Sequence, residues 1–189
     1  LGVTFGTAGM IMAAKNSLKT ADQMEKLERR LGVTTEALSE LKFAGEQSGV
    51  GFNTLTMGLQ RMSRRVAEAA QGTGEARAAL LELGIDAGKL AQLKPEAQFE
   101  AIAEAMTGVT TEGDKTRLAM KLFDSEGVAL LQTMEQGSKG IKDLRAEARA
   151  LGLTLSHEDA VAAAEANDAM NRLKASMTAM SQESTLNLA

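Results

Sequence analysis

The sequence predicts an all-α fold, and three observations support this prediction. The chain of 189 residues contains one proline, Pro95, and is rich in alanine, which favours helix. Valine, isoleucine and threonine rarely alternate at a period of two, the pattern of a half-buried strand. Six glycines each follow an apolar periodic run, where a left-handed residue ends many helices: Gly32, Gly49, Gly84, Gly108, Gly137 and Gly152. We therefore expect a chain cut into mostly short helices.

The first two predicted helices cover residues 8–31 and 35–47. The first has Ala21, Met24, Leu27 and Leu31 on its apolar side. The second begins after Thr34, whose hydroxyl can accept a hydrogen bond from a first-turn amide.

The third predicted helix, residues 53–71, is the most clearly amphipathic segment of the chain. Its apolar side chains recur at steps of four and three residues, as one buried stripe of a helix requires. The predicted core stripe is Leu55, Leu59, Met62 and Val66, and Ala69 continues it.

Two further helices are expected over residues 74–83 and 95–106, separated by a turn at 86–88. Pro95 stands where the first residue of a helix tolerates a missing N–H group. Phe99, Ile102 and Met106 follow it on one face.

Two capping boxes mark later helix starts, because in each pair the residues can satisfy each other's free backbone donors. Thr111 with Asp114 opens a helix that runs to Phe123, and Ser156 with Asp159 opens the last helix. Between them, helices at 127–136 and 139–151 are expected to bury Val128, Leu131, Met134, Ile141 and Leu144.

The last predicted helix runs from Ser156 to at least Gln182 without a glycine or proline. Its apolar positions alternate at three and four residues, a seam that suits a partner helix. The predicted seam is Ala163, Ala166, Met170, Leu173, Met177 and Met180. The pattern leaves open whether this seam belongs to the core of one chain or joins copies in a homo-oligomer.

Three parts follow from these elements. We expect an N-terminal helix at 1–31 that ends a longer region, a compact multi-helix domain at 32–155, and a long C-terminal helix at 156–189. Neither end resembles a natural terminus, so we expect a fragment of a longer protein.

The composition argues against catalysis. Cysteine is absent and His157 is the single histidine, which excludes disulfides, thiolate metal sites and the common histidine-based catalytic sets. His157 follows the Ser156 cap and is read as an exposed first-turn residue. The carboxylate pairs Glu158/Asp159 and Glu165/Asp168 are read as solvated helix faces. We therefore predict no catalytic, metal-binding or cofactor-binding residue, and we expect that the chain is not an enzyme.

The charges also argue against specific nucleic-acid binding. The net charge is −4, and acidic and basic residues alternate along the chain. Arg61, Arg64 and Arg65 lie on one flank of the third helix, as a solvated face or a contact for an acidic partner or phosphate. The run 72–74, Gly-Thr-Gly, resembles the start of a phosphate-binding loop, but no strand precedes it and Arg77 replaces the third glycine. We read it as a turn between helices.

The uncharged stretch from Leu1 to Ala14 is shorter than the roughly 20 apolar residues of a membrane-spanning helix. It could be the end of a longer apolar helix. Together with the methionine-rich C-terminal helix, it leaves open an alternative function, a membrane-active or channel-forming segment for DNA delivery.

The succession of phrases from Ala21 to Leu173 resembles the tail tape measure proteins of long-tailed bacteriophages and prophages. It comprises the run 31–85, beginning LGVTTEALSELKFAGEQSGV, then LKPEAQFEAIAEAM, LAMKLFDSEGVALL and EARALGLTLSHEDAVAAAEANDAMNRL. The chain departs from the family pattern at two positions. Lys94 precedes Pro95 where a serine cap is common, and Asp124 replaces a frequent glycine.

The resemblance implies a long helical virion protein that occupies the lumen of the tail and sets its length during assembly. Its implied partners are tail-tube and tail-tip proteins, assembly chaperones and copies of itself. It would lie in the host cytoplasm during assembly, leave the tail at genome delivery, and meet a membrane only during infection. The glycines of this fragment predict a compact or foldable module beside the rod.

Overall fold

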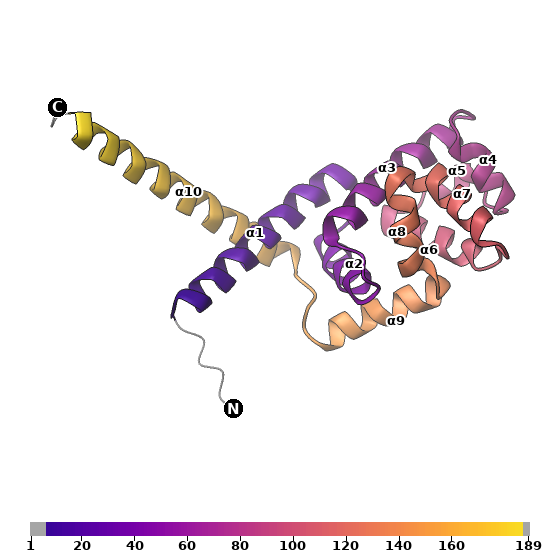
Figure 1. Ribbon diagram of the computed structural model, residues 1–189, viewed down its shortest axis with the longest axis horizontal. Coiled ribbons are helices and arrows are strands. Elements are labelled where there is room, and N and C mark those ends of the chain that lie inside the picture. Colours follow the sequence, from indigo (N-terminus) through magenta and orange to yellow (C-terminus); the bar gives the residue numbers. More distant parts are fainter. Residues whose placement is uncertain (1–6, 187–189) are drawn as a thin grey trace. The chain divides into compact units, whose positions relative to one another are not determined.

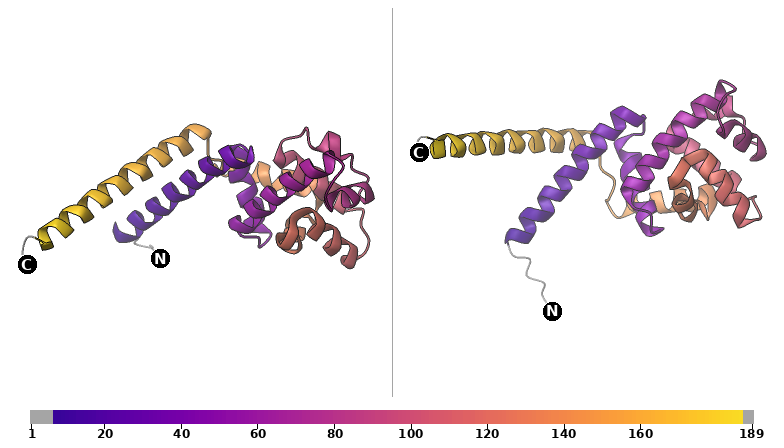
Figure 2. Two further views of the ribbon diagram at one scale, coloured as in Figure 1. Left: turned by 90° about the horizontal axis from the view of Figure 1, so that it is seen from above. Right: turned by 45° about the horizontal axis from the view of Figure 1, so that its top comes forward.

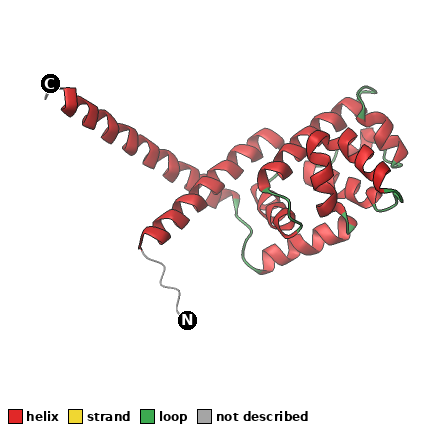
Figure 3. Cartoon of the chain, in the orientation of Figure 1, coloured by secondary structure: helices red, strands yellow, loops and turns green. Residues whose placement is uncertain are grey.

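The fold is all-α in a computed structural model that describes residues 7–186 and, among them, the side chains of residues 18–179. The described segments are helices joined by short loops, without a strand (Figure 3). They divide into two units. We call residues 27–154 the compact domain, and the described residues up to Lys26 together with those from Leu155 the terminal unit.

The compact domain begins with the last turn of α1 (Thr7–Leu31) and contains a succession of mostly short helices. These are α2 (Thr35–Gln47), α3 (Phe52–Ala70), α4 (Ala76–Glu82), α5 (Ala87–Leu90), α6 (Pro95–Met106), α7 (Glu112–Phe123), the 3₁₀ turn η1 (Asp124–Glu126), α8 (Gly127–Met134) and α9 (Gly137–Ala150). The predicted helices are present, with ends that match the prediction or differ from it by at most two residues.

Helix α3 is the centre of the compact domain. It packs against α2, α4, α5, α6, α7 and α8, and Figure 1 and Figure 2 show this group of helices from different sides. The predicted core stripe, Leu55, Leu59, Met62 and Val66, is completely buried. Gly58 on the same helix permits a close approach of α8, because a Cβ there would lie 2.3 Å from a methyl carbon of Leu130.

A second group of helix contacts is centred on α9, which packs against α2, α6 and α8. Phe99 of α6 meets Phe123 of α7 edge to face, with ring centroids 5.9 Å apart. This is a favourable geometry for two aromatic rings. Phe99, Ile102 and Met106 are buried, as their spacing predicts.

The predicted helix caps are formed. Thr34 Oγ1 accepts from the amide of Ala37 at 3.2 Å, and Thr111 Oγ1 accepts from that of Asp114 at 3.1 Å. Lys94, which precedes Pro95, forms no side-chain cap, because the lysine side chain has no hydrogen-bond acceptor. The expected turn at 86–88 is instead the start of α5, because the Asp86 carboxylate accepts from the amide of Lys89 and caps a short helix.

Two local predictions in the compact domain are wrong. Gly108 does not adopt a left-handed conformation, because α6 ends through Thr107 with ordinary backbone angles, whereas the other five predicted glycines do. Val128 is 50% exposed, and the predicted Leu131 and Leu144 are only half-buried, whereas α8 buries Leu130 together with the predicted Met134. The rotation follows from Gly127, where a Cβ would overlap the backbone of Ala119, so this face of α8 lies against α7.

The terminal unit contains α1 up to Lys26 and the helix α10 (His157–Leu186). Asn167 of α10 donates to the Asp22 carboxylate of α1 at 3.1 Å. The terminal helices therefore group together, rather than as the two separate parts expected, and the boundary in α1 lies before Leu27. Residues 1–6, part of the predicted apolar start, lie outside the described residues. Within residues 7–186, no helix combines the length and hydropathy needed to cross a membrane.

Candidate functional site

The C-terminal half of α10 carries an exposed apolar stripe. Met170 is 48% exposed, and Leu173 and Met177 are each 63% exposed. These three side chains line a shallow hollow with Lys174 and Thr178. We call Met170, Leu173 and Met177 the α10 stripe. Of the other predicted seam residues, Ala166 is exposed, Ala163 is half-buried, and the side chain of Met180 lies outside the described residues.

The α10 stripe is not on the most buried side of its helix. Ala160 is completely buried, and Ala164 and Asn167, at helical spacing from it, are half-buried. At about 100° per residue, the stripe lies roughly 60–120° around the helix from Asn167. The seam therefore combines positions of two faces, and its C-terminal half is available to a partner helix.

A cluster of charged side chains around the buried Glu40 lies between α2, α6 and α9, and we call it the Glu40 cluster. It comprises Glu40, Glu100, Arg145, Arg149 and Thr154. The side chain of Glu40 is only 4% exposed and accepts from Arg145 Nε at 2.9 Å and from Arg149 Nη1 at 2.6 Å. Arg145 also pairs with Glu100, and Thr154 Oγ1 lies 3.4 Å from Glu40. Both carboxylates of this cluster are thus paired, as a stable buried charge requires.

Arg61 and Arg65 hold the turn between α7 and α8. Arg61 donates to Ser125 Oγ at 2.6 Å and pairs with Glu126. Arg65 donates to the carbonyl of Lys121 at 2.6 Å and lies 3.3 Å from the Asp124 carboxylate. The expectation of a solvated arginine face is therefore wrong for these two residues, whose charges are engaged within the chain.

Arg64, the third arginine of that predicted face, is 57% exposed and pairs with Glu68 one helical turn away at 2.6 Å. For this residue the solvated interpretation is confirmed. An isolated pair of this kind contributes little to stability.

Asp124 has a backbone conformation that normally requires glycine, with φ 61° and ψ −141°. It occupies the position where the tape measure resemblance leads one to expect glycine. Residues with a Cβ persist in this region only when their surroundings enforce it. Here the carboxylate lies 3.3 Å from Arg65 and 3.6 Å from Arg61.

Exposed ion pairs and hydrogen bonds link other helices and lower the pKa of three carboxyl groups. Arg117 of α7 donates to both oxygens of Glu82 on α4, at 3.1 and 2.5 Å, which lowers the pKa of Glu82. The hydroxyl of Thr111, followed by Arg117, lowers the pKa of Asp114. Glu104 of α6 accepts from the hydroxyl of Ser138 at 2.6 Å and from its amide at 3.0 Å, and these bonds lower the pKa of Glu104.

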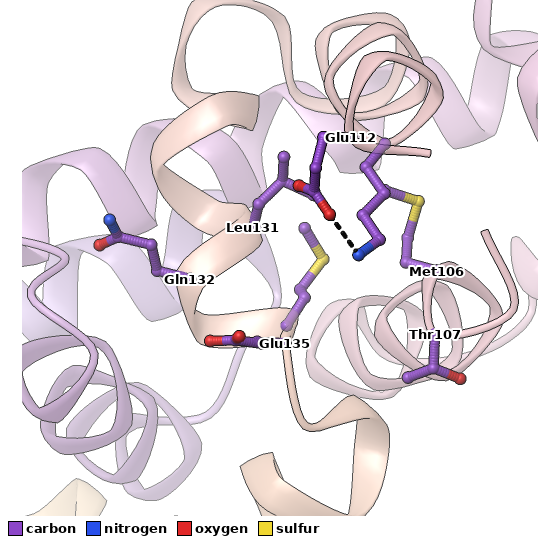
Figure 4. Close-up of a pocket in the computed structure, with 8 residues that line it drawn as sticks. Met106, Thr107, Glu112, Leu131, Gln132 and Glu135 are labelled. Carbon is purple, nitrogen blue, oxygen red and sulfur yellow. Dashed lines mark hydrogen bonds and ion pairs between the residues drawn. The ribbon is translucent and has the colours of Figure 1, made fainter. Parts of the chain in front are cut away.

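A cavity of about 290 Å³ lies where α6, α7 and α8 approach one another (Figure 4). Met106 and Met134 contribute apolar atoms, while Lys115 donates to Glu112 one turn away on α7 at 2.8 Å. Gln132 and Glu135 point from α8. This lining is a mixture of methionine sulfur, apolar carbon and one exposed ion pair, and it offers no nucleophile paired with a base.

The remaining residues considered for chemistry are dispersed. His157 is exposed at the start of α10, and Glu158, Glu165 and Asp168 are exposed along it. Asp159 accepts from the Ser156 hydroxyl at 2.8 Å and belongs to the helix cap. Within the described part of the chain, no group of three or more histidine, aspartate or glutamate side chains could hold a metal ion.

The run 72–74 forms a turn between α3 and α4, as predicted. Gly72 and Gly74 have φ of 82° and 78°, and Thr73 Oγ1 donates to the carbonyl of Glu68. The segment before it is a helix, so the strand of a phosphate-binding loop is absent among these described residues.

Sequence reasoning missed the Glu40 cluster. A weak signal exists on α2, where Glu40 lies within the apolar face formed by Ala37, Leu38 and Leu41. Another exists on α9, where Arg145 and Arg149 are one turn apart. Neither signal identifies its partner, because more than 100 residues separate them.

Comparison with known proteins identifies no relative: no family model, curated protein or solved structure matches this chain.

Proposed function

We propose that this chain is a structural segment of a phage tail tape measure protein, which acts inside the tail tube during assembly and is released at genome delivery. The observation that carries the proposal is the contrast between two kinds of helix. The compact domain is punctuated by left-handed glycines, whereas α10 runs uninterrupted from His157 to Leu186 and exposes an apolar stripe.

The length of α10 supports the ruler part of this proposal. An α-helix advances about 1.5 Å per residue, so adding or removing helical residues changes its length in proportion. The 30 residues of α10 correspond to roughly 45 Å of helix. The compact domain contributes far less length per residue unless it opens.

The α10 stripe supports a role in contact with other helices. Met170, Leu173 and Met177 are exposed in a single chain, and burying them would remove apolar surface from water. Methionine adapts to irregular surfaces, which suits a protein that contacts several partners. The proposed partners are copies of the same chain, tail-tube and tail-tip proteins, and assembly chaperones.

Tail length in phage with altered parent genes tests the ruler role. Deleting residues 168–181, about two heptads, keeps the register of α10 and should shorten the tail by about 21 Å. The mean length of many tails is measured by electron microscopy.

A matched variant separates length from contact. Replacing residues 168–181 by an equally long stretch of polar helix-forming residues removes the α10 stripe and keeps the residue count. A ruler predicts tails of normal length in this variant. Tails of normal length in the deletion, or an absence of tails in both variants, would instead assign this segment to delivery or to the start of assembly.

A further inference from the structure

A second exposed apolar surface lies at the end of the compact domain formed by α3, α4 and α5. It is a hollow of about 410 Å³, with apolar walls that include Ala69, Ala78, Leu81 and Ile85. Arg77 and Asp86 line the same hollow. The surface therefore combines an apolar centre with one positive and one negative side chain.

Leu81 is the most exposed large apolar side chain of the described residues, at 79%. The opposite face of α4 packs against the rest of the domain, since Ala76, Ala79 and Leu80 are buried. A single exposed leucine is ordinary on a protein surface. Here, however, Leu81 borders an apolar hollow. A leucine of a second molecule could bind in this hollow.

The two charges of this surface are available for contacts with a partner. The side chain of Arg77 makes no hydrogen bond or ion pair with any residue that the structure describes. Asp86 uses Oδ1 to cap α5, at 2.9 Å from the amide of Lys89, which leaves its Oδ2 for a cation. Arg77, Leu81 and Asp86 all line this hollow, so the two charges and the exposed leucine belong to one surface patch.

We propose that this surface binds a second copy of the same chain about a two-fold axis that passes near Leu81. In a two-fold interface, if residue i contacts residue j, then j contacts i. Arg77 of each copy then faces Asp86 of the other, and each Leu81 lies against the hollow of its partner. The opposite charges of one patch thus complement an identical patch, which fits a second copy better than a strongly acidic or basic partner.

The association is weak, because this patch is small compared with the surface buried in stable dimers. It is independent of the α10 stripe, which lies in the terminal unit. The experiments therefore use the full chain carrying Met170→Gln and Leu173→Gln, so that contacts through α10 do not contribute.

Disulfide trapping tests the position of the axis. The chain contains no cysteine, so Leu81→Cys introduces one thiol per molecule, and a dimer band after mild oxidation reports the meeting of two copies at this residue. The matched control is Leu151→Cys, at a 59% exposed leucine elsewhere in the compact domain. We expect Leu81→Cys to cross-link several-fold faster. Equal rates would show that the surface does not bind a second copy.

Charge reversal tests the pairing. In the Leu81→Cys chain, Arg77→Asp places two acidic groups opposite each other, and Asp86→Arg places two basic groups opposite each other. Each variant alone should cross-link several-fold more slowly than the parent.

A mixture of the two charge-reversed variants should recover cross-linking as a heterodimer, detected by mass, because both contacts then join opposite charges. Recovery also shows that both variants are folded. If circular dichroism shows folded variants and the mixture cross-links no faster than either variant alone, the proposed pairing is wrong. Failure of this dimer would leave the tail-length experiment unaffected.

Discussion

Glu40 of α2 and Arg145 of α9 are 105 residues apart in the sequence, yet Arg145 Nε donates to Glu40 Oε2 at 2.9 Å. The same carboxylate oxygen accepts from Arg149, so one buried group joins two turns of α9 to α2. Helix α9 buries few large apolar side chains, Ile141 being the main one. The Glu40 cluster is therefore a principal attachment of α9 to the rest of the domain.

Glu40→Ala should lower the free energy of unfolding of the compact domain by about 3 kcal/mol, because it leaves the partly buried Arg145 with Glu100 alone and Arg149 without a carboxylate. Glu46→Ala is the matched control on the same helix, since the 49% exposed Glu46 pairs with Lys42 near the surface. This control should lose at most about 0.5 kcal/mol. Urea denaturation followed by circular dichroism measures both, and equal losses would contradict the role of the cluster.

Leu59→Asp should unfold the compact domain. The side chain is completely buried in the stripe of α3, and an unpaired carboxylate there costs several kcal/mol. Met57→Asp, two residues earlier and at a 43% exposed position, should have little effect. The comparison is made by circular dichroism and thermal melting. An unchanged melt for Leu59→Asp would show that the domain does not depend on this stripe.

Asp124→Gly should be more stable than Asp124→Ala by about 1–2 kcal/mol, because both lose the carboxylate but only alanine keeps a Cβ in the strained conformation. At ordinary backbone angles, glycine is less stabilising than alanine. A more stable glycine variant would therefore indicate a left-handed residue 124. Unfolding in urea gives the difference. A more stable alanine variant would mean that residue 124 has ordinary backbone angles in solution.

Ser138→Ala should raise the pKa of Glu104 towards its ordinary value. The variant removes the hydroxyl, the largest cause of the lowered pKa, and keeps the bond from the amide of residue 138. The pKa of Glu104 should therefore remain below the ordinary value. Carbon-13 chemical shifts of the side-chain carboxyl give it directly as a function of pH.

The same bonds give the sign of a pH effect. Because the pKa of Glu104 is lowered on folding, its bonds to Ser138 stabilise the start of α9 above the ordinary range of glutamate, about pH 4.3. This contribution is lost as the pH falls through the lowered pKa. Amide exchange at the start of α9 should therefore become faster in acid, and less so in Ser138→Ala.

Met170→Gln with Leu173→Gln should leave the compact domain folded and reduce self-association. Both side chains are exposed on α10, so the change removes apolar surface without opening a cavity. Light scattering measures the mass, and circular dichroism checks the fold. An unchanged mass would exclude the α10 stripe as a contact between copies.

The sequence by itself determined the features that depend on neighbours three and four residues apart. Thr34 and Thr111 cap their helices because the hydroxyl lies within reach of an amide three residues later. The stripe from Leu55 to Val66 is buried because its spacing places all four side chains on one side of α3. The helical fold class follows from such local patterns, repeated between glycines.

The tertiary structure alone decided which helix faces meet and which charges pair. Gly127 packs against Ala119, and this contact rotates α8 so that Leu130 is buried and Val128 exposed. Arg61 and Arg65 look like a solvated face in the sequence, but α7 and η1 bring their partners to them. Glu40 finds Arg145 only after α2 and α9 have packed. Such pairings depend on distances between segments remote in the chain, which local spacing does not encode.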